Sequence, residues 1–488
     1  MEESVLPQEN FKARRPVLSA MSEYNVAMSW IIPGGLAVVA AGLLGYVGQA
    51  GLPDARVPVR VPAARAGGAG SGDTASPLDE GNLSVSSELG EQLPGSWAGF
   101  RGDDGNAISS ESVPLADVWG AGGPEVLWSV DLGEGYAGAA VRHGRVYVMD
   151  YDREAKADAL RCLSLASGKE LWRFSYPLSV KRNHGMSRTV PVVTDKYVVS
   201  IGPKCHVSCL DAVTGEFRWG IDMVRRYGTA VPPWYAGQCP IVDDGRVILA
   251  PAGDEVLMTA VDVETGEMVW ETPNPKGWKM THVSILPVEM GGTRSYVYCG
   301  SRGVVGVAAE DGALLWDSTD WKISIATVAT PVPVPGERLF FSGGYKAGSM
   351  MMQVTPDGDT WSAAEEFRLS DDVFGATQQT PLLYDGYIYG VRPNGELVCL
   401  TPDGRIQWAS GLDHRYGLGP FLVADGKIFV MDDHGKLTMA EASPDGFKVL
   451  DEAEVLDGHD SWGPMAIAGG RLILRDLTRM VCVDVSRK

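Results

Sequence analysis

Short alternations of hydrophobic and polar residues, each introduced by a tight turn, recur along most of the chain. The turns contain Gly, Asp or Pro, and the residues that follow alternate with a period of two, as in a half-buried β-strand. Eight copies occur, spaced by roughly 40–50 residues. They begin at His143, Thr194, Asp244, Gly291, Pro335, Asp385, Asp425 and Gly469. The pattern predicts an all-β protein made of eight similar units.

A second signal follows each of the first seven copies: a strand, a glycine turn and then a large hydrophobic residue, as in TGEFRW at Thr214–Trp219. The two signals together describe four short antiparallel strands, which form one blade of a β-propeller. A tryptophan at one fixed position in most units packs most simply between neighbouring blades. This structural role is expected for Trp128, Trp172, Trp219, Trp270, Trp316 and Trp408.

The eighth unit, which ends at VCVDVSRK, has no glycine turn and no fourth strand. A spare strand lies before the first unit at Glu125–Leu132, and it carries Trp128 in register with the other blade tryptophans. Pairing this strand with residues 464–485 closes the ring and leaves no open sheet edge between the first and last blades. The predicted fold is therefore an eight-bladed β-propeller of four-stranded antiparallel blades.

The N-terminal region lacks this alternation. Residues 24–53 carry no charge, and their apolar part, 30–50, is long enough for one membrane helix of about 20 residues. Lys12, Arg14 and Arg15 precede this stretch, which favours an N-terminus on the cytoplasmic side. The sequence therefore predicts an N-terminal transmembrane anchor.

A cleaved signal peptide is the alternative, because Gly48-Gln49-Ala50 has the small-x-small pattern of a cleavage site. The predicted organisation is a cytoplasmic segment over 1–29, then the anchor or signal peptide over 30–50. Residues 51–95 are rich in Ala, Gly, Pro and Ser, which predicts a flexible linker. The propeller is expected over 96–488.

Composition narrows the choice of partners. The chain has 42 Lys and Arg against 62 Asp and Glu, a net charge of −20. Nucleic acid is therefore not an expected partner, because binding to phosphates needs a basic surface. Seven cysteines in 488 residues are too few, and odd in number, for a scaffold held by disulfides.

The repeats resemble those of a known family. The segments Leu210–Trp219 and Ala260–Trp270 are similar to the pyrroloquinoline-quinone-like (PQQ-like) propeller repeat, and Ser96–Ser109 (SWAGFRGDDGNAIS) resembles the W-x-G-F-R-G opening of many bacterial PQQ-like repeat proteins. Eight blades behind an N-terminal export segment also resemble the BamB-type outer-membrane assembly proteins. The resemblance implies a role in envelope protein assembly, although BamB-type proteins use a lipid anchor and no cysteine lies near residues 30–50 here.

Enzymatic chemistry finds little support in the motifs. Quinoprotein dehydrogenases with this repeat carry an adjacent Cys–Cys disulfide, and this chain has no Cys–Cys dipeptide and no GxSxG, HExxH or phosphate-binding loop. Four cysteines share one repeat position, so the symmetry places them in separate blades, too far apart to share a metal. These are Cys162, Cys209, Cys399 and Cys482. No catalytic residue, metal or cofactor is expected.

The segments that enter the innermost strands carry residue types that bind ligands. In a propeller these loops surround the central channel on one face, and here they contain rings and hydrogen-bonding side chains typical of interaction hot spots. Arg188 and Arg415 have the geometry to hold a carboxylate. The candidate binding residues are His184, Arg188, Trp234, Tyr235, Trp278, His282, Gln378, Gln379, Arg415, Tyr416, His459 and Trp462. The structural alternative is that these loops are merely solvated and their rings cap the funnel.

These observations predict a non-catalytic binding or scaffold protein on the periplasmic side of a bacterial cytoplasmic membrane. It would dock an envelope or membrane protein on the channel face, or by strand addition to an outer blade edge. One alternative is a protein that binds a small ligand in the channel, including a quinone-dependent oxidoreductase. The other is a carbohydrate-binding surface built on the aromatic loops.

Overall fold

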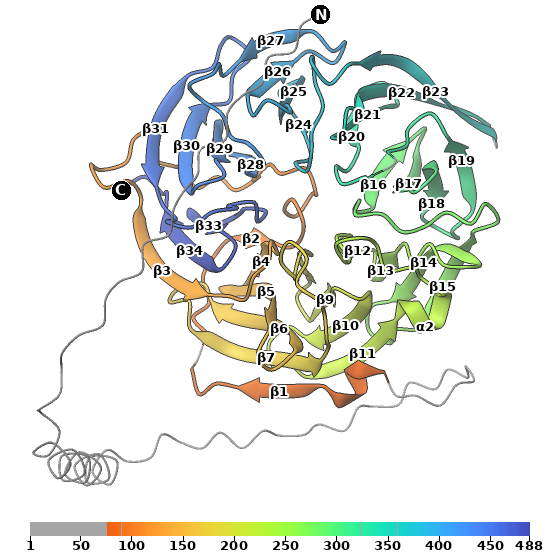
Figure 1. Ribbon diagram of the computed structural model, residues 1–488, viewed down its shortest axis with the longest axis horizontal. Helices are drawn as coiled ribbons and strands as arrows, with labels where there is room; N and C mark the ends of the chain where they lie inside the picture. Colours follow the sequence, from red (N-terminus) through yellow and green to blue (C-terminus); the bar gives the residue numbers. More distant parts are fainter. Residues whose placement is uncertain (1–75, 89, 324, 359) are drawn as a thin grey trace, which may run out of the picture. The chain divides into compact units, whose positions relative to one another are not determined.

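A computed structural model of the chain describes residues 76–488 with the exceptions of 89, 324 and 359. It shows eight β-sheets arranged around a central axis (Figure 1), which confirms the predicted eight-bladed propeller. The segments expected at 1–29, 30–50 and 51–75 lie outside the described residues. Within the described part of the chain, no helix is both long and apolar enough to cross a membrane.

Each blade has four antiparallel strands, and the first blade has one additional strand at each edge. From the channel outward, blade 1 contains β2 (Ser96–Trp97), β4 (Ala139–Arg142), β5 (Arg145–Asp152), β6 (Ala157–Ser164), β7 (Glu170–Pro177) and β1 (Asn82–Val85), and blade 2 contains β8 (Val192–Val193), β9 (Tyr197–Ile201), β10 (His206–Asp211) and β11 (Phe217–Asp222). Blade 3 contains β12 (Ile241–Asp243), β13 (Arg246–Leu249), β14 (Val256–Asp262) and β15 (Met268–Pro273), and blade 4 contains β16 (Leu286–Met290), β17 (Thr293–Gly300), β18 (Gly303–Ala308) and β19 (Leu314–Ser318).

In the same order, blade 5 contains β20 (Val332–Val334), β21 (Arg338–Gly343), β22 (Gly348–Asp357) and β23 (Thr360–Leu369), and blade 6 contains β24 (Leu382–Tyr384), β25 (Tyr387–Val391), β26 (Leu397–Leu400) and β27 (Ile406–Ala409). Blade 7 contains β28 (Phe421–Ala424), β29 (Lys427–Met431), β30 (Lys436–Glu441) and β31 (Val449–Glu454), and blade 8 contains β32 (Ala466–Ala468), β33 (Arg471–Arg475), β34 (Arg479–Asp484) and β3 (Glu125–Asp131). Two short helices, η1 (Pro77–Glu80) and α2 (Met223–Tyr227), lie outside the sheets.

The turns that begin the repeats are tight hairpins between the innermost strand and the next. In blade 3, Asp244 and Gly245 both have positive φ, 47° and 71°. In blade 6, Asp385 and Gly386 repeat this geometry with φ of 47° and 80°. Two consecutive residues with positive φ are the signature of a two-residue turn that matches the twist of the strands, and Asp-Gly is a preferred sequence for it. The turn residues therefore set the register of each blade.

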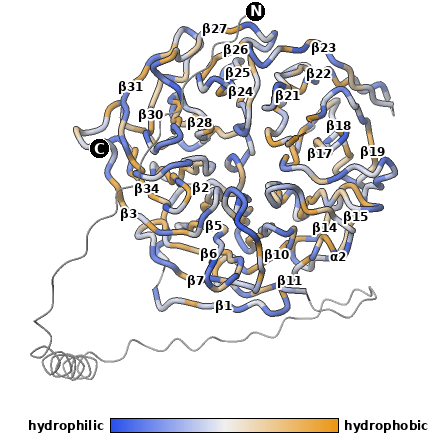
Figure 2. Tube along the Cα trace, in the orientation of Figure 1, coloured by the Kyte–Doolittle hydropathy of each residue, from blue (hydrophilic) through white to orange (hydrophobic). Residues whose placement is uncertain are grey.

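Hydrophobic positions recur along the strands of every blade (Figure 2), and many of them fill the spaces between adjacent blades. The blade tryptophans lie in these spaces. The Trp172 indole N–H donates to the carbonyl of Ala212 in blade 2 over 3.3 Å, and its ring covers Gly215. A Cβ at Gly215 would lie 2.7 Å from this ring, so only glycine fits. Trp128, Trp219, Trp270 and Trp408 donate in the same way to carbonyls of the next blade.

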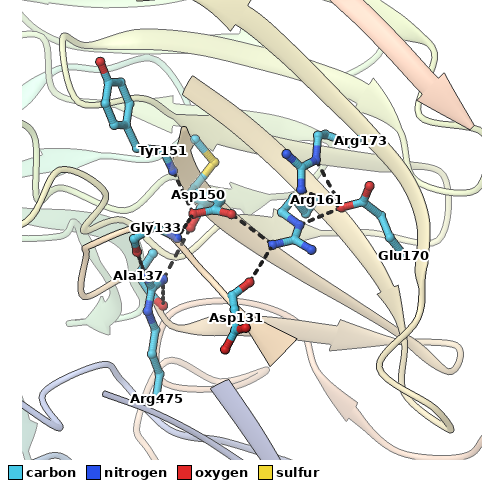
Figure 3. Close-up of polar contacts among 10 residues, drawn as sticks. Asp131, Gly133, Ala137, Asp150, Tyr151, Arg161, Glu170, Arg173 and Arg475 are labelled. Carbon is cyan, nitrogen blue, oxygen red and sulfur yellow. Dashed lines mark hydrogen bonds and ion pairs between the residues drawn. The ribbon is translucent and has the colours of Figure 1, made fainter. Parts of the chain in front are cut away.

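The ring closes as predicted. Strand β3 pairs antiparallel with β34, and Trp128 lies opposite Cys482. Two buried arginines reinforce the seam between blades 8 and 1 (Figure 3). Arg475 of blade 8 donates to the carbonyls of Gly133 and Ala137 over 2.8 and 3.0 Å.

Arg161 of blade 1 completes this seam from the other side. Its guanidinium donates to the carbonyl of Asp131 in β3 over 3.1 Å, and it pairs with Asp150 and Glu170 over 3.0 and 2.7 Å (Figure 3). Buried N–H groups need acceptors, and each arginine finds some of them across the seam: Arg161 reaches the carbonyl of Asp131 in blade 8, and Arg475 reaches the segment that leads into blade 1. Closure therefore rests on side chains as well as on strand pairing.

The first blade contains residues that the sequence assigned to the linker over 51–95. Residues 82–85 form β1, which pairs antiparallel with β7 from Asn82 opposite Ser175 to Val85 opposite Trp172. Leu78 of η1 is only 3% exposed. Alanine- and glycine-rich composition over 51–75 obscured the apolar residues that follow, and these residues find an open sheet edge on which to pair. Leu78 and residues 82–85 therefore pack on blade 1, so the propeller begins before residue 96.

Candidate functional site

One end of the central channel is crossed by residues 96–111, here called the floor segment. Its strand β2 pairs with the innermost strand of blade 1, with Trp97 opposite Val141. The carbonyl of Ala98 accepts from the backbone N–H of Val193 in blade 2 over 2.7 Å. Ile108 bridges to Val423 in blade 7. These partners lie toward the ends of the innermost strands, so the floor segment closes the channel at that end.

Arg101 fixes the floor segment to blade 6. Its guanidinium donates to the carbonyls of Thr380 and Pro381, both over 2.9 Å, and to those of Gly105 and Asn106 within its own loop. Burial lowers the pKa of Arg101 to about 9, so the side chain stays positively charged at neutral pH. The W-x-G-F-R-G sequence therefore has a physical role that the sequence alone did not indicate.

Above the floor segment lies a cavity of about 370 Å³. Trp97, Phe100, Arg101 and Ala107 form its base. Its walls come from the segments that precede the innermost strand of every one of the eight blades. The wall residues are Tyr136, His184, Arg188, Trp234, Gly237, Cys239, His282, Ser284, Ala326, Val328, Gln378, Gln379, Thr380, Leu418, Pro420, Trp462, Pro464 and Met465, with Tyr345 from the β21–β22 hairpin and Phe421 and Leu422 from β28.

The structure brings seven of the twelve predicted binding residues to this cavity. They are His184, Arg188, Trp234, His282, Gln378, Gln379 and Trp462. Three others lie outside its lining. Tyr235 donates its hydroxyl to the carbonyl of Lys181 over 2.6 Å, and Arg415 and His459 are exposed on loops that enter the innermost strands.

The remaining two predicted residues are not on the surface. Trp278 is 2% exposed and Tyr416 is 1% exposed, so both rings belong to the hydrophobic core. The Trp278 indole packs against Gly300, where a Cβ would approach it to 2.9 Å. The prediction assumed that these two rings are exposed on loops, and this assumption is wrong. Burial of a large ring in the core is more favourable than its exposure on a loop.

Arg188 lines the cavity from the segment that precedes β8. Its Nη2 donates to the carbonyls of Asn183 and His184, each over 2.9 Å, and its Nε donates to the carbonyl of Trp234. The guanidinium carbon lies 5.3 Å from the centroid of the Tyr136 ring, within the range of a cation–π interaction. Burial lowers the pKa of Arg188, but its ordinary value is so high that the charge persists.

Two pairs of rings flank this arginine. Tyr136 stacks on Trp462 with ring centroids 5.2 Å apart, and the Trp462 indole N–H donates to Asp433 over 2.7 Å. On the other side, Trp234 and His282 lie 6.2 Å apart. Burial first, and then the charge of Arg188, lower the pKa of His282 to about 4. His282 is therefore neutral at pH 7.

The backbone around the cavity is strained. Five lining residues other than glycine have positive φ: Arg101, Ala107, His184, Trp234 and Tyr345. A residue with a Cβ pays an energetic penalty in this conformation, and such residues gather at functional sites where the surroundings impose them. No sequence pattern marked these positions, because the strain arises from how eight loops meet around one axis.

The cysteine that lines the cavity is kept in its protonated thiol form by burial. Burial raises the pKa of the Cys239 thiol to about 11, so it is not a thiolate at neutral pH. All seven cysteines are buried and unpaired. Among the residues that the structure describes, no group of three or more His, Cys, Asp or Glu is placed to hold a metal ion. The lining offers rings and positive charge as groups that can recognise a ligand.

Comparison with known proteins agrees with this fold. The chain is 21% identical over 346 residues to the outer membrane protein assembly factor BamB of Moranella endobia (strain PCIT), which covers 68% of this chain and 72% of that protein. The solved structure of BamB from Moraxella catarrhalis matches with a TM-score of 0.50 at 14% identity, over 74% of this chain and 99% of that one.

Enzymes share the same fold. The quinohemoprotein alcohol dehydrogenase ADHIIG of Pseudomonas putida HK5 matches with a TM-score of 0.54 at 15% identity, over 81% of each chain. At this identity the likeness concerns the fold alone. The sequence model of the outer membrane protein assembly factor BamB matches residues 155–410, which is more than half of the chain. The propeller, its repeats and this match together show that the chain belongs to the BamB family of PQQ-like repeat proteins.

Proposed function

We propose that the chain is a non-catalytic binding scaffold of the cell envelope that docks a partner envelope protein on the channel face of its propeller. The observation that carries this proposal is the cavity, which all eight blades wall and the floor segment closes from beneath. Such a cavity is open to a partner from one side only. The family supports the kind of partner, since its members are outer membrane assembly factors by name.

The chemistry of the lining supports a role in binding. Burial and then the charge of Arg188 lower the pKa of His282, which leaves it a weak proton acceptor at neutral pH. Cys239 is held as a thiol and accepts a hydrogen bond from the backbone N–H of Val190 over 3.2 Å. Rings and arginine, by contrast, are the residue types that contribute most to protein interfaces.

Site-specific photo-crosslinking in membranes tests the proposal. A photoreactive residue in place of Tyr345, which lines the cavity and is 47% exposed, should form an adduct with an envelope protein. The matched control replaces Asp385, an exposed residue of the β24–β25 turn at the opposite end of the innermost strand. The adduct should be lost when Trp234→Ala and Trp462→Ala are combined. Equal adducts from positions 345 and 385 would refute docking on this face.

The second candidate is a protein that binds a small ligand in the channel, including a quinone-dependent oxidoreductase. The size of the cavity favours this candidate, because small-molecule sites commonly occupy about 300–1,000 Å³. A rise in melting temperature with pyrroloquinoline quinone and calcium would support it. A carbohydrate-binding surface is the third candidate, and glycan binding that is lost in Trp234→Ala would support it.

The anchor is part of the same proposal. We infer that residues 30–50 hold the propeller on the periplasmic side of the cytoplasmic membrane through a single pass, on the strength of their uncharged, apolar sequence. Fractionation of the full chain into membranes, with the N-terminal residue of the mature protein determined, tests this placement. A mature chain that begins at Gly51 would show cleavage and exclude the anchor.

A further inference from the structure

The cavity concentrates positive charge in a protein whose net charge is −20. Arg188 and Arg101 both line it. Within the part of the chain that the structure describes, neither guanidinium forms an ion pair with a carboxylate; both contact backbone carbonyls instead. Carbonyl dipoles satisfy hydrogen bonds but do not neutralise a charge. A half-buried charge without a counter-ion is costly, so the site favours the binding of an anion.

The two arginines differ in how many of their N–H donors remain available for a ligand. Arg101 has hydrogen bonds to four carbonyls from Nε, Nη1 and Nη2 together. Arg188 uses Nε and Nη2, and no hydrogen bond of its Nη1 occurs among the described residues. The Nη1 group therefore retains donors on the residue that lines the wall. The carbonyls that hold the rest of the guanidinium fix its direction, so these donors are preorganised for a ligand.

Two carboxylates that contact the wall rings are already engaged. Asp460 accepts from the Tyr136 hydroxyl over 3.1 Å, and Asp433 accepts from the Trp462 indole over 2.7 Å and from the backbone N–H of Leu418 over 2.8 Å. These bonds hold the stacked rings of Tyr136 and Trp462 in place. The result is a flat aromatic wall beside an unneutralised guanidinium.

We propose that the cavity binds a carboxylate carried on a flat, apolar body, with Arg188 holding the carboxylate and the rings of Tyr136, Trp462 and Trp234 enclosing the body. Charge-assisted contacts between arginine and carboxylate are among the strongest polar contacts, and aromatic walls favour flat ligands. This inference goes beyond the proposed function because it assigns the ligand chemistry of the cavity. The carboxylate belongs either to a side chain of a docked partner or to a free small acid.

A matched pair of probes tests the inference on the detergent-solubilised full chain. The probes are 3-phenylpropanoate and 3-phenylpropanamide, which share their ring and chain and differ in the charged group. Tryptophan fluorescence titration should show at least about tenfold tighter binding of the acid than of the amide. Arg188→Gln should remove this preference, and Arg415→Gln, an exposed arginine on the same face, should retain it. Equal binding of the two probes to the wild-type chain, or no binding of either, would overturn the inference.

A second measurement on the wild-type chain does not depend on a variant that folds. The charge of Arg188 contributes to the lowered pKa of His282, which is about 4. An anion beside Arg188 should raise the pKa of His282, measured from its imidazole signals by NMR, and the amide probe should leave it unchanged. An unchanged pKa at saturating acid would place the anion elsewhere and contradict the inference.

The source of the carboxylate follows from a peptide arm of the same titration. The probes are acetyl-Gly-Glu-Phe-Gly-amide and its Gln counterpart. A preference for the Glu peptide favours a partner side chain, whereas binding of the free acid without binding of either peptide favours a small acid. Loss of the crosslinked adduct described above, with the probe preference intact, would refute the scaffold function and leave this inference standing.

Discussion

The two ends of the central channel are built on different principles. At one end the floor segment joins the innermost strands through backbone hydrogen bonds, and its Trp97 is 2% exposed. At the other end, eight loops present rings and an arginine, and His184, Trp234 and Tyr345 lie in strained backbone conformations. Stability is concentrated at the closed end and recognition groups at the open end. Substitutions at the two ends should therefore separate folding from binding.

The largest effect is expected at the floor. Trp97→Ala removes a buried indole that packs on Gly102, where a Cβ would lie only 3.2 Å from the ring. The free energy of unfolding should fall by about 3–5 kcal/mol. Denaturation in urea measures this change, with Trp234→Ala at the open end as the control. A similar loss in both variants would contradict the division between the two ends.

Arg101→Gln should follow in size. The substitution removes the charge and leaves the carbonyls of Thr380 and Pro381 without their donor, which should cost about 2–4 kcal/mol. The melting temperature of the propeller reports the loss, and Arg415→Gln on an exposed loop should leave it nearly unchanged. Equal melting temperatures of the two variants would contradict the role of Arg101 in holding the floor segment to the blades.

A smaller effect should appear in the pH dependence. The pKa of His282 is about 4 when folded and about 6.5 when unfolded, so the unfolded chain binds more protons between these values. Stability from this residue is complete above about pH 7 and is lost as the pH falls toward 4, by about 1–2 kcal/mol after allowance for solvent screening. Unfolding free energies of wild type and His282→Gln at pH 7 and pH 4.5 test this. An identical pH dependence in the two proteins would contradict the assignment.

The smallest change in stability is expected at the open end itself. Trp234 is half-buried and packs loosely against His282, so Trp234→Ala should lower the free energy of unfolding by less than about 1 kcal/mol. Binding of 3-phenylpropanoate should nevertheless weaken several-fold, because the ring forms part of the wall. Calorimetric melting and the fluorescence titration read the two effects separately. A large loss of stability would show that this ring supports the fold.

The fold was predictable because its determinants are local and repeated. Glycine turns, alternating strands and tryptophans recur at each blade, and the missing strand of the last blade is visible as Glu125–Leu132. The cavity was predictable only in part. The candidate loops were located by their place just before the innermost strands, but the burial of Trp278 and Tyr416 depends on neighbouring strands that the sequence does not place.

The floor segment escaped prediction for a related reason. Its sequence resembles the N-terminal motif of a family of repeat proteins. Nothing in residues 96–111 indicates that they cross the channel, because the blades that form the channel follow later in the sequence. Arg101 meets its acceptors at Thr380 and Pro381, which lie 279 and 280 residues away. Residues 96–111 stand outside the repeats, so no periodic signal indicates these partners. The side of the site formed by short-range loops could be inferred, and the side formed by long-range contacts could not.

The pairing of β3 with β34 also dictates an order of events during synthesis. The strand with Trp128 leaves the ribosome early, yet its partner strand, with Cys482, is among the last residues to be made. Blades 1 to 7 can assemble as an open arc while the early strand waits, and the ring locks only when the final strand arrives. The propeller therefore gains the stability that ring closure provides in a single late step. A chain that stops before residue 479 would lack β34 and would remain an open arc.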